Sequence, residues 1–136
     1  MIKTATELDQ LTVNEYRKKY FTLTELAAIP INERVICAYD DASDDFILGE
    51  LGHLEDGSPV WVVMCFKASV GNIRPLIRRS AEIARDTGHI DTPVIWLPQK
   101  NIVRERAVNL LLQPVERFVR GKKYWECPAR KTLARS

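Results

Sequence analysis

Residues 46–66 read FILGELGHLEDGSPVWVVMCF, and this stretch defines the centre of the fold. Two runs rich in apolar residues, 46–54 and 60–66, flank EDGSP at 55–59, and Asp-Gly is a strong signal for a hairpin turn. The second run, Val60 to Phe66, is apolar at every position, as in a strand that is covered on both faces. The sequence therefore predicts a β-hairpin whose second strand lies at the centre of a sheet.

A helix is predicted directly after the hairpin, from Asn72 as N-cap to Gly88. Its apolar residues recur with helical spacing, while the arginines among them face away. Residues 93–97 then form a buried strand, and a second helix has an apolar stripe that ends before Pro114. The stripe consists of Val103, Ala107, Leu110 and Leu111. Residues 115–119 and 123–127 bracket Gly121 and predict a closing pair of strands.

The segment before the hairpin begins with a strand, and two capping boxes follow it. Thr12 with Glu15, and Thr22 with Glu25, each open a short helix. Residues 35–39 form the next strand. The predicted class is thus α+β (α/β), with a mixed central sheet and the element order β-α-α-β-β-β-α-β-α-β-β. We expect one domain over residues 1–128 and a free basic tail over residues 129–136.

Length and composition limit the classes of protein. The chain has 136 residues, enough for one hydrophobic core. Its apolar runs are much shorter than the ~20 residues that cross a bilayer, and no leader is recognised, so we expect a soluble intracellular protein. The three cysteines have no CxxC spacing, which favours buried reduced thiols over a metal site.

Charge is distributed unevenly along the chain. Residues 1–68 carry 6 Lys and Arg against 12 Asp and Glu, while residues 69–136 carry 14 against 6. The halves therefore stand at −6 and +8 within a net charge of +2. Such an asymmetry can steer an anionic ligand or orient a partner.

The opening residues, MIKTATELD at 1–9, and the element order behind them resemble the GNAT family of acyl-CoA N-acyltransferases. The resemblance implies that strands four and five splay apart around the pantetheine arm of the coenzyme, with its pyrophosphate at the N-terminus of the long helix. It places the cofactor-binding positions at Met64, Phe66, Val70, Gly71, Asn72 and Asn101.

The residues at the two family motifs depart from the usual pattern. In the coenzyme loop only Gly71 matches, because Ala68 replaces the usual Gln or Arg and the branched Ile73 replaces a small residue. Near the position of the proton-donating tyrosine stand Leu110 and Leu111, which have no hydroxyl. The catalytic residues are therefore unknown, and we expect no bound cofactor.

Other chemical signals are weak. Glu50, His53 and Glu55 are candidates for a general base, but none has a distinctive setting. His89 follows a helix-ending glycine, where the helix C-terminus explains it. The aspartates of residues 40–45 lack the spacing of a calcium loop and indicate a solvated acidic turn, so no metal site is predicted.

Three functions remain open. The first is a GNAT-fold binding or structural component that has lost catalysis and acts on a protein partner. A looser similarity to phage internal virion proteins, in Gly57 to Trp61, Trp96 and Asn101, extends it to a virion-associated component. The second is a divergent N-acyltransferase that uses acetyl-CoA. The third is nucleic-acid binding through a basic C-terminal segment whose Phe118 and Tyr124 are expected to pack inward. Its cations are Arg117, Arg120, Lys122, Lys123, Arg130, Lys131 and Arg135.

Overall fold

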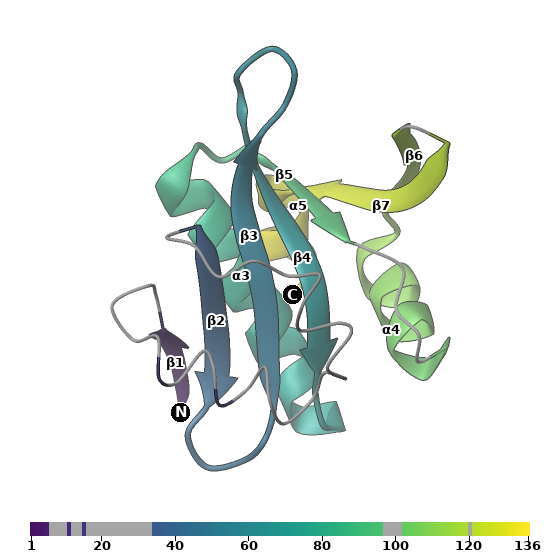
Figure 1. Ribbon diagram of the computed structural model, residues 1–136. Helices are drawn as coiled ribbons and strands as arrows, with labels where there is room; N and C mark the ends of the chain where they lie inside the picture. Colours follow the sequence, from purple (N-terminus) through teal and green to yellow (C-terminus); the bar gives the residue numbers. More distant parts are fainter. Residues whose placement is uncertain (6–10, 12–14, 16–33, 97–101, 120) are drawn as a thin grey trace.

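A computed structural model describes residues 1–5, 11, 15, 34–96, 102–119 and 121–136 (Figure 1). Apart from Glu15, which is helical, the two short helices predicted between the first two strands lie outside the described residues. The described part is a mixed α+β structure built on one sheet, which confirms the predicted class. Among its residues no helix is long and apolar enough to cross a membrane.

The described residues form one seven-stranded sheet in the order β1-β2-β3-β4-β5-β7-β6. All neighbouring strands are antiparallel except β4 and β5, which run parallel. Strand β4 is fourth of the seven, so the prediction that it lies at the centre is confirmed. The bounds are β1 Ile2–Ala5, β2 Val35–Asp40, β3 Phe46–His53, β4 Pro59–Lys67, β5 Pro93–Trp96, β6 Val115–Val119 and β7 Lys122–Pro128.

The predicted hairpin joins β3 and β4. At its tip the Gly57 N–H donates to the Leu54 carbonyl (2.9 Å) and the Leu54 N–H donates to the Ser58 carbonyl (2.8 Å). Gly57 has a φ of 84°, a conformation that side chains other than that of glycine rarely adopt. The Asp-Gly signal is thus confirmed, because the turn needs this glycine.

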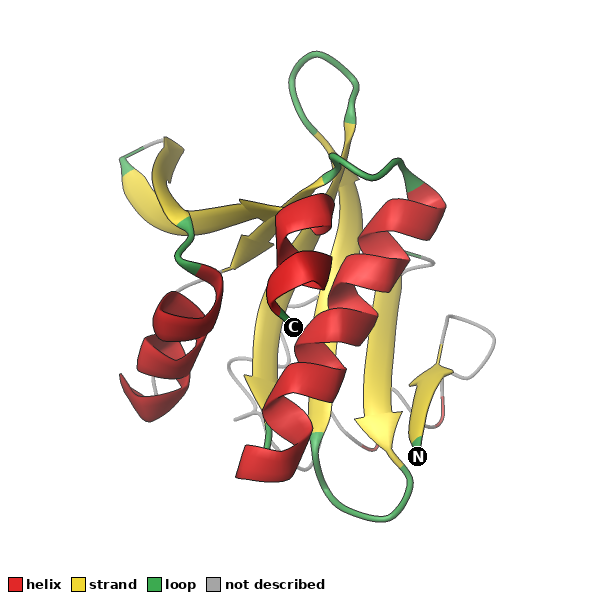
Figure 2. Cartoon of the chain, turned by 180° about the vertical axis from the view of Figure 1, so that it is seen from behind, coloured by secondary structure: helices red, strands yellow, loops and turns green. Residues whose placement is uncertain are grey.

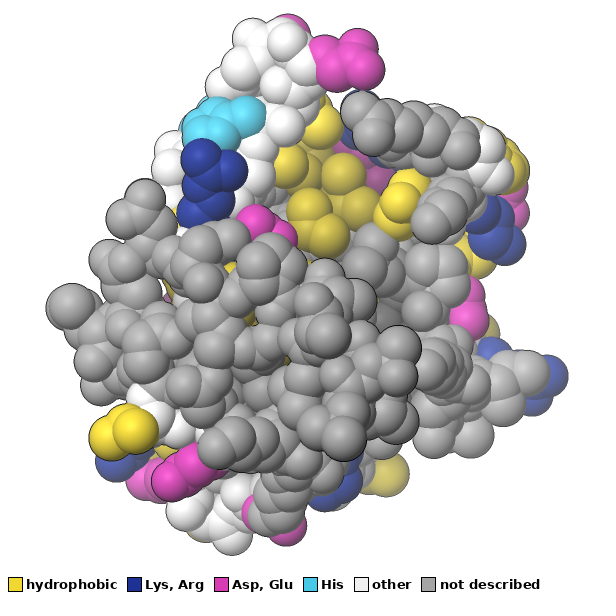
Figure 3. Space-filling model, viewed as in Figure 1, with side chains coloured by type: hydrophobic (Ala, Val, Ile, Leu, Met, Phe, Trp, Pro, Cys, Tyr) yellow, Lys and Arg dark blue, Asp and Glu magenta, His cyan; other side chains and the backbone are white. Residues whose placement is uncertain are grey.

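Both faces of the sheet are apolar, as the sequence of β4 requires. Trp61, Val63 and Phe66 belong to the larger core cluster, together with the buried side of the long helix. Met64 is half-buried and packs against a second cluster, formed mainly by side chains of β2 and β3. Figure 3 shows further apolar side chains below the tip of the β3–β4 hairpin, on the face that Figure 1 presents. The centre of the sheet therefore carries apolar clusters on both faces, and the apolar side chains below the hairpin tip lie at the surface.

The long helix α3 (Ile73–Thr87) follows a short 3₁₀ turn, η2 (Val70–Asn72). It buries Leu76, Ile77, Ala81 and Ala84 against the sheet and ends at Gly88, as the periodicity predicts. Figure 2 shows α3 and the C-terminal helix α5 (Ala129–Arg135) lying on the same face of the sheet. Helix α4 (Ile102–Leu112) lies to the side of them, near β7.

The expected free tail at residues 129–136 was wrong, because most of it forms α5. Ala129 and Thr132, three residues apart, are fully buried, and α5 packs on α3. The Ala129 N–H donates to the Thr92 carbonyl (2.9 Å) and the Arg130 N–H donates to the Ile90 carbonyl (2.7 Å). The basic composition hid this helix, since its buried side consists of small residues.

Candidate functional site

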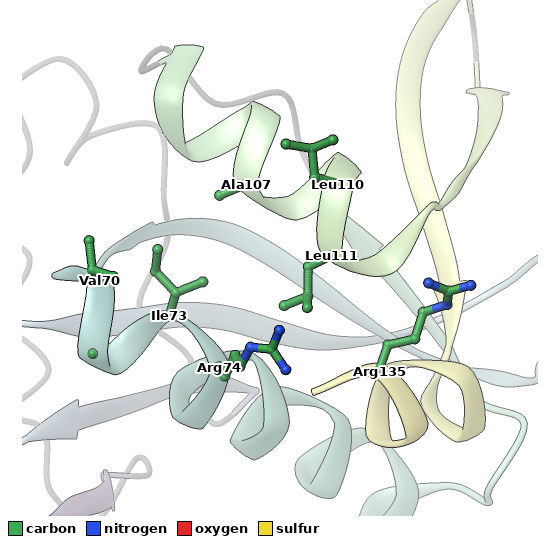
Figure 4. Close-up of a pocket in the computed structure, with 8 residues that line it drawn as sticks. Val70, Ile73, Arg74, Ala107, Leu110, Leu111 and Arg135 are labelled. Carbon is green, nitrogen blue, oxygen red and sulfur yellow. The ribbon is translucent and has the colours of Figure 1, made fainter.

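A groove lies between the start of α3, the outer side of α4 and the end of α5 (Figure 4). Its volume is about 820 Å³, within the ~300–1,000 Å³ of typical ligand sites. Apolar side chains form most of its lining, and two guanidinium groups complete it. The lining residues are Val70, Gly71, Ile73, Arg74, Ala107, Leu110, Leu111 and Arg135.

Helix α4 lines the groove with the stripe that the sequence singles out. Ala107, Leu110 and Leu111 occupy neighbouring turns, and Leu110 is 80% exposed. The core instead receives Val108 and Leu112, which are almost fully buried. The sequence therefore identified an apolar stripe of α4, but the structure buries the adjacent one. Leu111 is half-buried and packs against the edge of the core, so the apolar side chain of this stripe that the core leaves uncovered is Leu110.

The opposite side of the groove comes from η2 and the first turn of α3. Val70 is 90% exposed on η2, and Ile73 is half-buried at the first helical position. In Figure 4 both side chains extend toward α4. Branched side chains thus occupy the helix start at which small residues would leave backbone N–H groups accessible to phosphate.

Two arginines make the groove positive. Arg74 lies on the first turn of α3, and its side chain points into the space between the helices (Figure 4). Within the described residues it makes no hydrogen bond or ion pair. Arg135 donates to the side-chain oxygen of Gln113 (3.1 Å), at the end of α4. Among the described residues that line the groove no carboxylate is present, so the charged side chains on its surface are cationic.

The loop before α3 is fastened to the acidic turn of residues 40–45. The Asp45 carboxylate accepts hydrogen bonds from the Ser69 N–H (3.0 Å), the Ser69 hydroxyl and the Asn72 side-chain amide (2.8 Å). The same amide also donates to Asp40 (2.9 Å). Asp45 is only 4% exposed and Asp40 is also buried, so a fully solvated acidic turn was wrong for these two residues.

The pKa values of both carboxyl groups lie below their usual range. For Asp40 the hydrogen bond from Asn72 is the largest cause of the lowered pKa, followed by the bond from the N-terminal ammonium. For Asp45 burial acts to raise the pKa, but the hydrogen bonds from Ser69 and Asn72 outweigh it. Both groups are therefore ionised at neutral pH and place negative charge beside the start of α3.

The predicted cofactor-binding residues do not form one cluster. Val70 and Gly71 line the groove, whereas the Asn72 side chain is held by the acidic turn. Phe66 is buried and packs edge-on against Trp96, with ring centroids 5.7 Å apart. Met64 packs against the second core cluster. Asn101 lies outside the described residues.

The sequence reasoning missed Arg135 as a residue of this groove. It was assigned to a free tail, and only the packing of α5 on α3 brings it near Arg74 and α4. Leu110 and Leu111 were identified as part of an apolar helical stripe and as residues that replace a tyrosine, but not as the lining of a groove. The signal in the sequence was the apolar stripe of α4, from which Leu110 remains exposed.

The candidate general bases stay apart from the groove. Glu50 lies within β3, His53 ends that strand, and Glu55 is in the turn of the hairpin. None of the three lines the groove. Among the residues that the structure describes, no group of His, Cys, Asp and Glu side chains could hold a metal ion.

The basic C-terminal segment is largely engaged within the chain. Arg117 pairs with Glu126 (3.0 Å), and Lys123 lies over the Trp125 ring (4.5 Å from the centroid). Arg130 pairs with Asp91 (3.0 Å). Each of these cations would have to give up an internal contact to bind phosphate.

The prediction that Phe118 packs inward was wrong, because this side chain is 66% exposed. It lies on β6, which is the edge strand of the sheet that the described residues form and pairs there with β7. Tyr124, which was expected to pack inward as well, is half-buried.

Compared with known proteins, the sequence matches no protein-family model and no curated protein. The class of the chain therefore rests on its fold, a mixed α+β domain on one mostly antiparallel sheet.

Proposed function

We propose that this chain is a GNAT-fold protein without acyl-transfer activity that serves as a binding or structural component. The order of its sheet supports the proposal, with α3 connecting the parallel strands β4 and β5. These strands pair over three residue pairs only, from Trp61 with Val94 to Val63 with Trp96. Strand β4 continues to Lys67 while β5 turns away from it (Figure 1). A coenzyme arm would lie in such a divergence in the family that the sequence resembles.

The observation that carries the loss of catalysis is the acidic contact at the start of α3. The family resemblance puts a pyrophosphate at this helix terminus. Here Asp45 accepts three hydrogen bonds from Ser69 and Asn72, and so adds a negative charge next to the expected phosphate position. Ile73 replaces a small residue beside it. Coulomb repulsion and steric crowding both oppose a phosphate there.

The outer side of α4 supports the same conclusion. Acyl transfer needs a group that protonates the leaving thiolate, and Leu110 and Leu111 stand near the position of that donor. Both instead line an apolar groove. A role in a phage virion is a finer form of this proposal, and it rests on the sequence similarity in Gly57 to Trp61, Trp96 and Asn101.

Thermal unfolding of the full chain with acetyl-CoA, CoA or ATP tests the proposal. A ligand at 100 times its dissociation constant stabilises a protein by about 2.7 kcal/mol, a rise of roughly 8–10 °C in Tm at this length. We expect no specific rise with acetyl-CoA. A rise with acetyl-CoA that ATP does not produce, and that Arg74→Glu abolishes, would overturn the proposal.

A divergent acetyl-CoA-dependent N-acyltransferase is the second candidate, and one observation favours it. The ladder between β3 and β4 shifts between Leu48 and Gly49, so that Met64 has no partner on β3. Bulges of this kind are frequent beside functional sites, and this one lies where β4 and β5 begin to diverge. Acetylation of an amine panel by the full chain would establish this candidate, whereas binding of acetyl-CoA without turnover would support neither function.

A further inference from the structure

Helix α4 presents more apolar surface than the core of this molecule uses. Its buried residues Val108 and Leu112 are four positions apart, as one helical face requires. Ala107, Leu110 and Leu111 form a second stripe, on which Leu110 is 80% exposed. Val70 is 90% exposed and lies on the other side of the same groove. Large apolar side chains gathered at an open groove are typical of an interaction site.

The charge of the groove specifies what such an occupant carries. Among the described residues that line the groove, the charged ones are Arg74 and Arg135, and both are cationic. Arg74 makes no ion pair within the described part of the chain, so its charge is available to a partner. The second half of the sequence is positive overall, at +8. The complementary occupant therefore bears carboxylates.

The arrangement of these groups suits an elongated ligand. In Figure 4 the apolar residues Val70 and Ile73 lie toward one end of the groove, Arg74 lies between the helices, and Arg135 lies at the other end. A helix that docks in a groove uses apolar side chains three and four positions apart and presents charges beside them. The open volume of about 820 Å³ between two helices is suited to a segment of that shape.

We propose that the groove binds an acidic amphipathic helical segment of another protein. Its apolar side chains pack on Val70, Ile73, Leu110 and Leu111, and its carboxylates pair with Arg74 and Arg135. This inference rests on the proposed binding role and names the chemistry of the partner. It needs no acyl-CoA chemistry.

Selection from a random peptide display library on the immobilised full chain tests the inference. The library is first depleted on a Leu110→Asp, Arg74→Glu variant, so that only peptides that need the groove are enriched. We expect sequences with Leu or Ile at three- and four-residue spacing and with Asp or Glu flanking them. The enriched peptide is then labelled, and its affinity is measured by fluorescence anisotropy.

Single variants locate the binding site. Leu110→Asp should weaken binding at least tenfold, because it puts a carboxylate on an apolar contact. Arg74→Glu should weaken it about tenfold at 0.15 M salt and less at 1 M, where charges are screened. The matched controls are Phe118→Asp, at another exposed apolar residue, and Arg78→Glu, one turn further along α3; both should bind within twofold of the wild type.

Several results would overturn the inference. They are the enrichment of basic or purely polar peptides, no enrichment above the depleted variant, or equal weakening by the control variants. Displacement of the peptide by oleate but not by unlabelled peptide would indicate a fatty-acid site, and loss of an existing dimer in Leu110→Asp would indicate a second copy. A failed selection together with no acetyl-CoA shift leaves the proposed function standing, whereas acetyl transfer overturns that function itself.

Discussion

Replacing Asp45 by asparagine removes a negative charge from the start of α3 while it keeps the size and shape of the side chain. In the wild type one carboxylate oxygen accepts three hydrogen bonds, two from Ser69 and one from Asn72. These bonds join the turn after β2 to the loop before α3, which are 24 or more residues apart in sequence. The variant tests whether this ionic contact holds the two segments together.

The size of the effect follows from the number of bonds and the burial of Asp45. A hydrogen bond to a charged group contributes about 1.5–3 kcal/mol and a neutral one about 0.5–1.5 kcal/mol. Three such bonds lose roughly 1 kcal/mol each, and part of this loss is offset because the neutral amide is cheaper to bury. We therefore expect the free energy of unfolding to fall by about 2 kcal/mol at pH 7. For a chain of this length that corresponds to roughly 6–8 °C in Tm.

The difference between wild type and variant should depend on pH. The pKa of Asp45 is lowered in the folded state from its ordinary value of 3.8, so its carboxylate contributes stability above that value. This contribution is lost as the pH falls through the still lower folded pKa. The two proteins should thus differ fully at pH 6–7 and converge as the pH falls below about 4.

Urea unfolding followed by tryptophan fluorescence at several pH values measures this difference. Asp86→Asn is the matched control, because Asp86 is exposed on α3 and, within the described part of the chain, its ion pair is with its neighbour Arg85 (2.9 Å). That change should stay within about 0.5 kcal/mol. A loss below 0.5 kcal/mol for Asp45→Asn at pH 7, or a loss that is unchanged at pH 3, would refute the reasoning.

Three further predictions test the packing. In Gly49→Ala the added methyl group would lie within 2.7 Å of ring atoms of the buried Trp61. We therefore expect the free energy of unfolding, measured in urea, to fall by about 1–3 kcal/mol. Gly71→Ala is the control: its methyl group would have nothing within 4 Å, and the free energy of unfolding should change by less than about 0.5 kcal/mol. Equal effects of the two would mean that Trp61 moves aside. Burial raises the pKa of Cys37 to about 12, so at pH 8 little of the reactive thiolate is present. Its thiol should therefore resist a disulfide reagent until the protein unfolds. Reaction of Cys37 at the rate of a free thiol would contradict its burial. Deleting residues 129–136 should lower the free energy of unfolding by at least about 2 kcal/mol, because α5 packs on α3. An unchanged melting temperature would instead mean that these residues are a free tail.

Elements with strong local patterns could be predicted from the sequence. The hairpin follows from Asp-Gly between two apolar runs, and α3 from its periodicity up to Gly88. The central place of β4 follows because a strand that is apolar at every position needs cover on both faces. In each case the residues that carry the signal are neighbours in the sequence.

The candidate site could be predicted only in part. Val70 and Gly71 were identified from the loop before α3, and both line the groove. Arg135 could not be identified, because its position depends on the docking of α5 against α3. Asn72 was taken as a ligand residue, but its amide is bound to Asp40 and Asp45, which lie at least 27 residues earlier in the chain.

The sequence alone thus determined the class of the fold, the strand at its centre and the absence of a hydroxyl near the expected donor position, Leu110 and Leu111. These are properties of residue type and spacing. The tertiary structure decided which stripe of α4 is buried, how α5 completes the groove and that Asp45 lies at the start of α3. Those outcomes depend on contacts between distant segments, and helical periodicity cannot show which of two apolar stripes the core will cover.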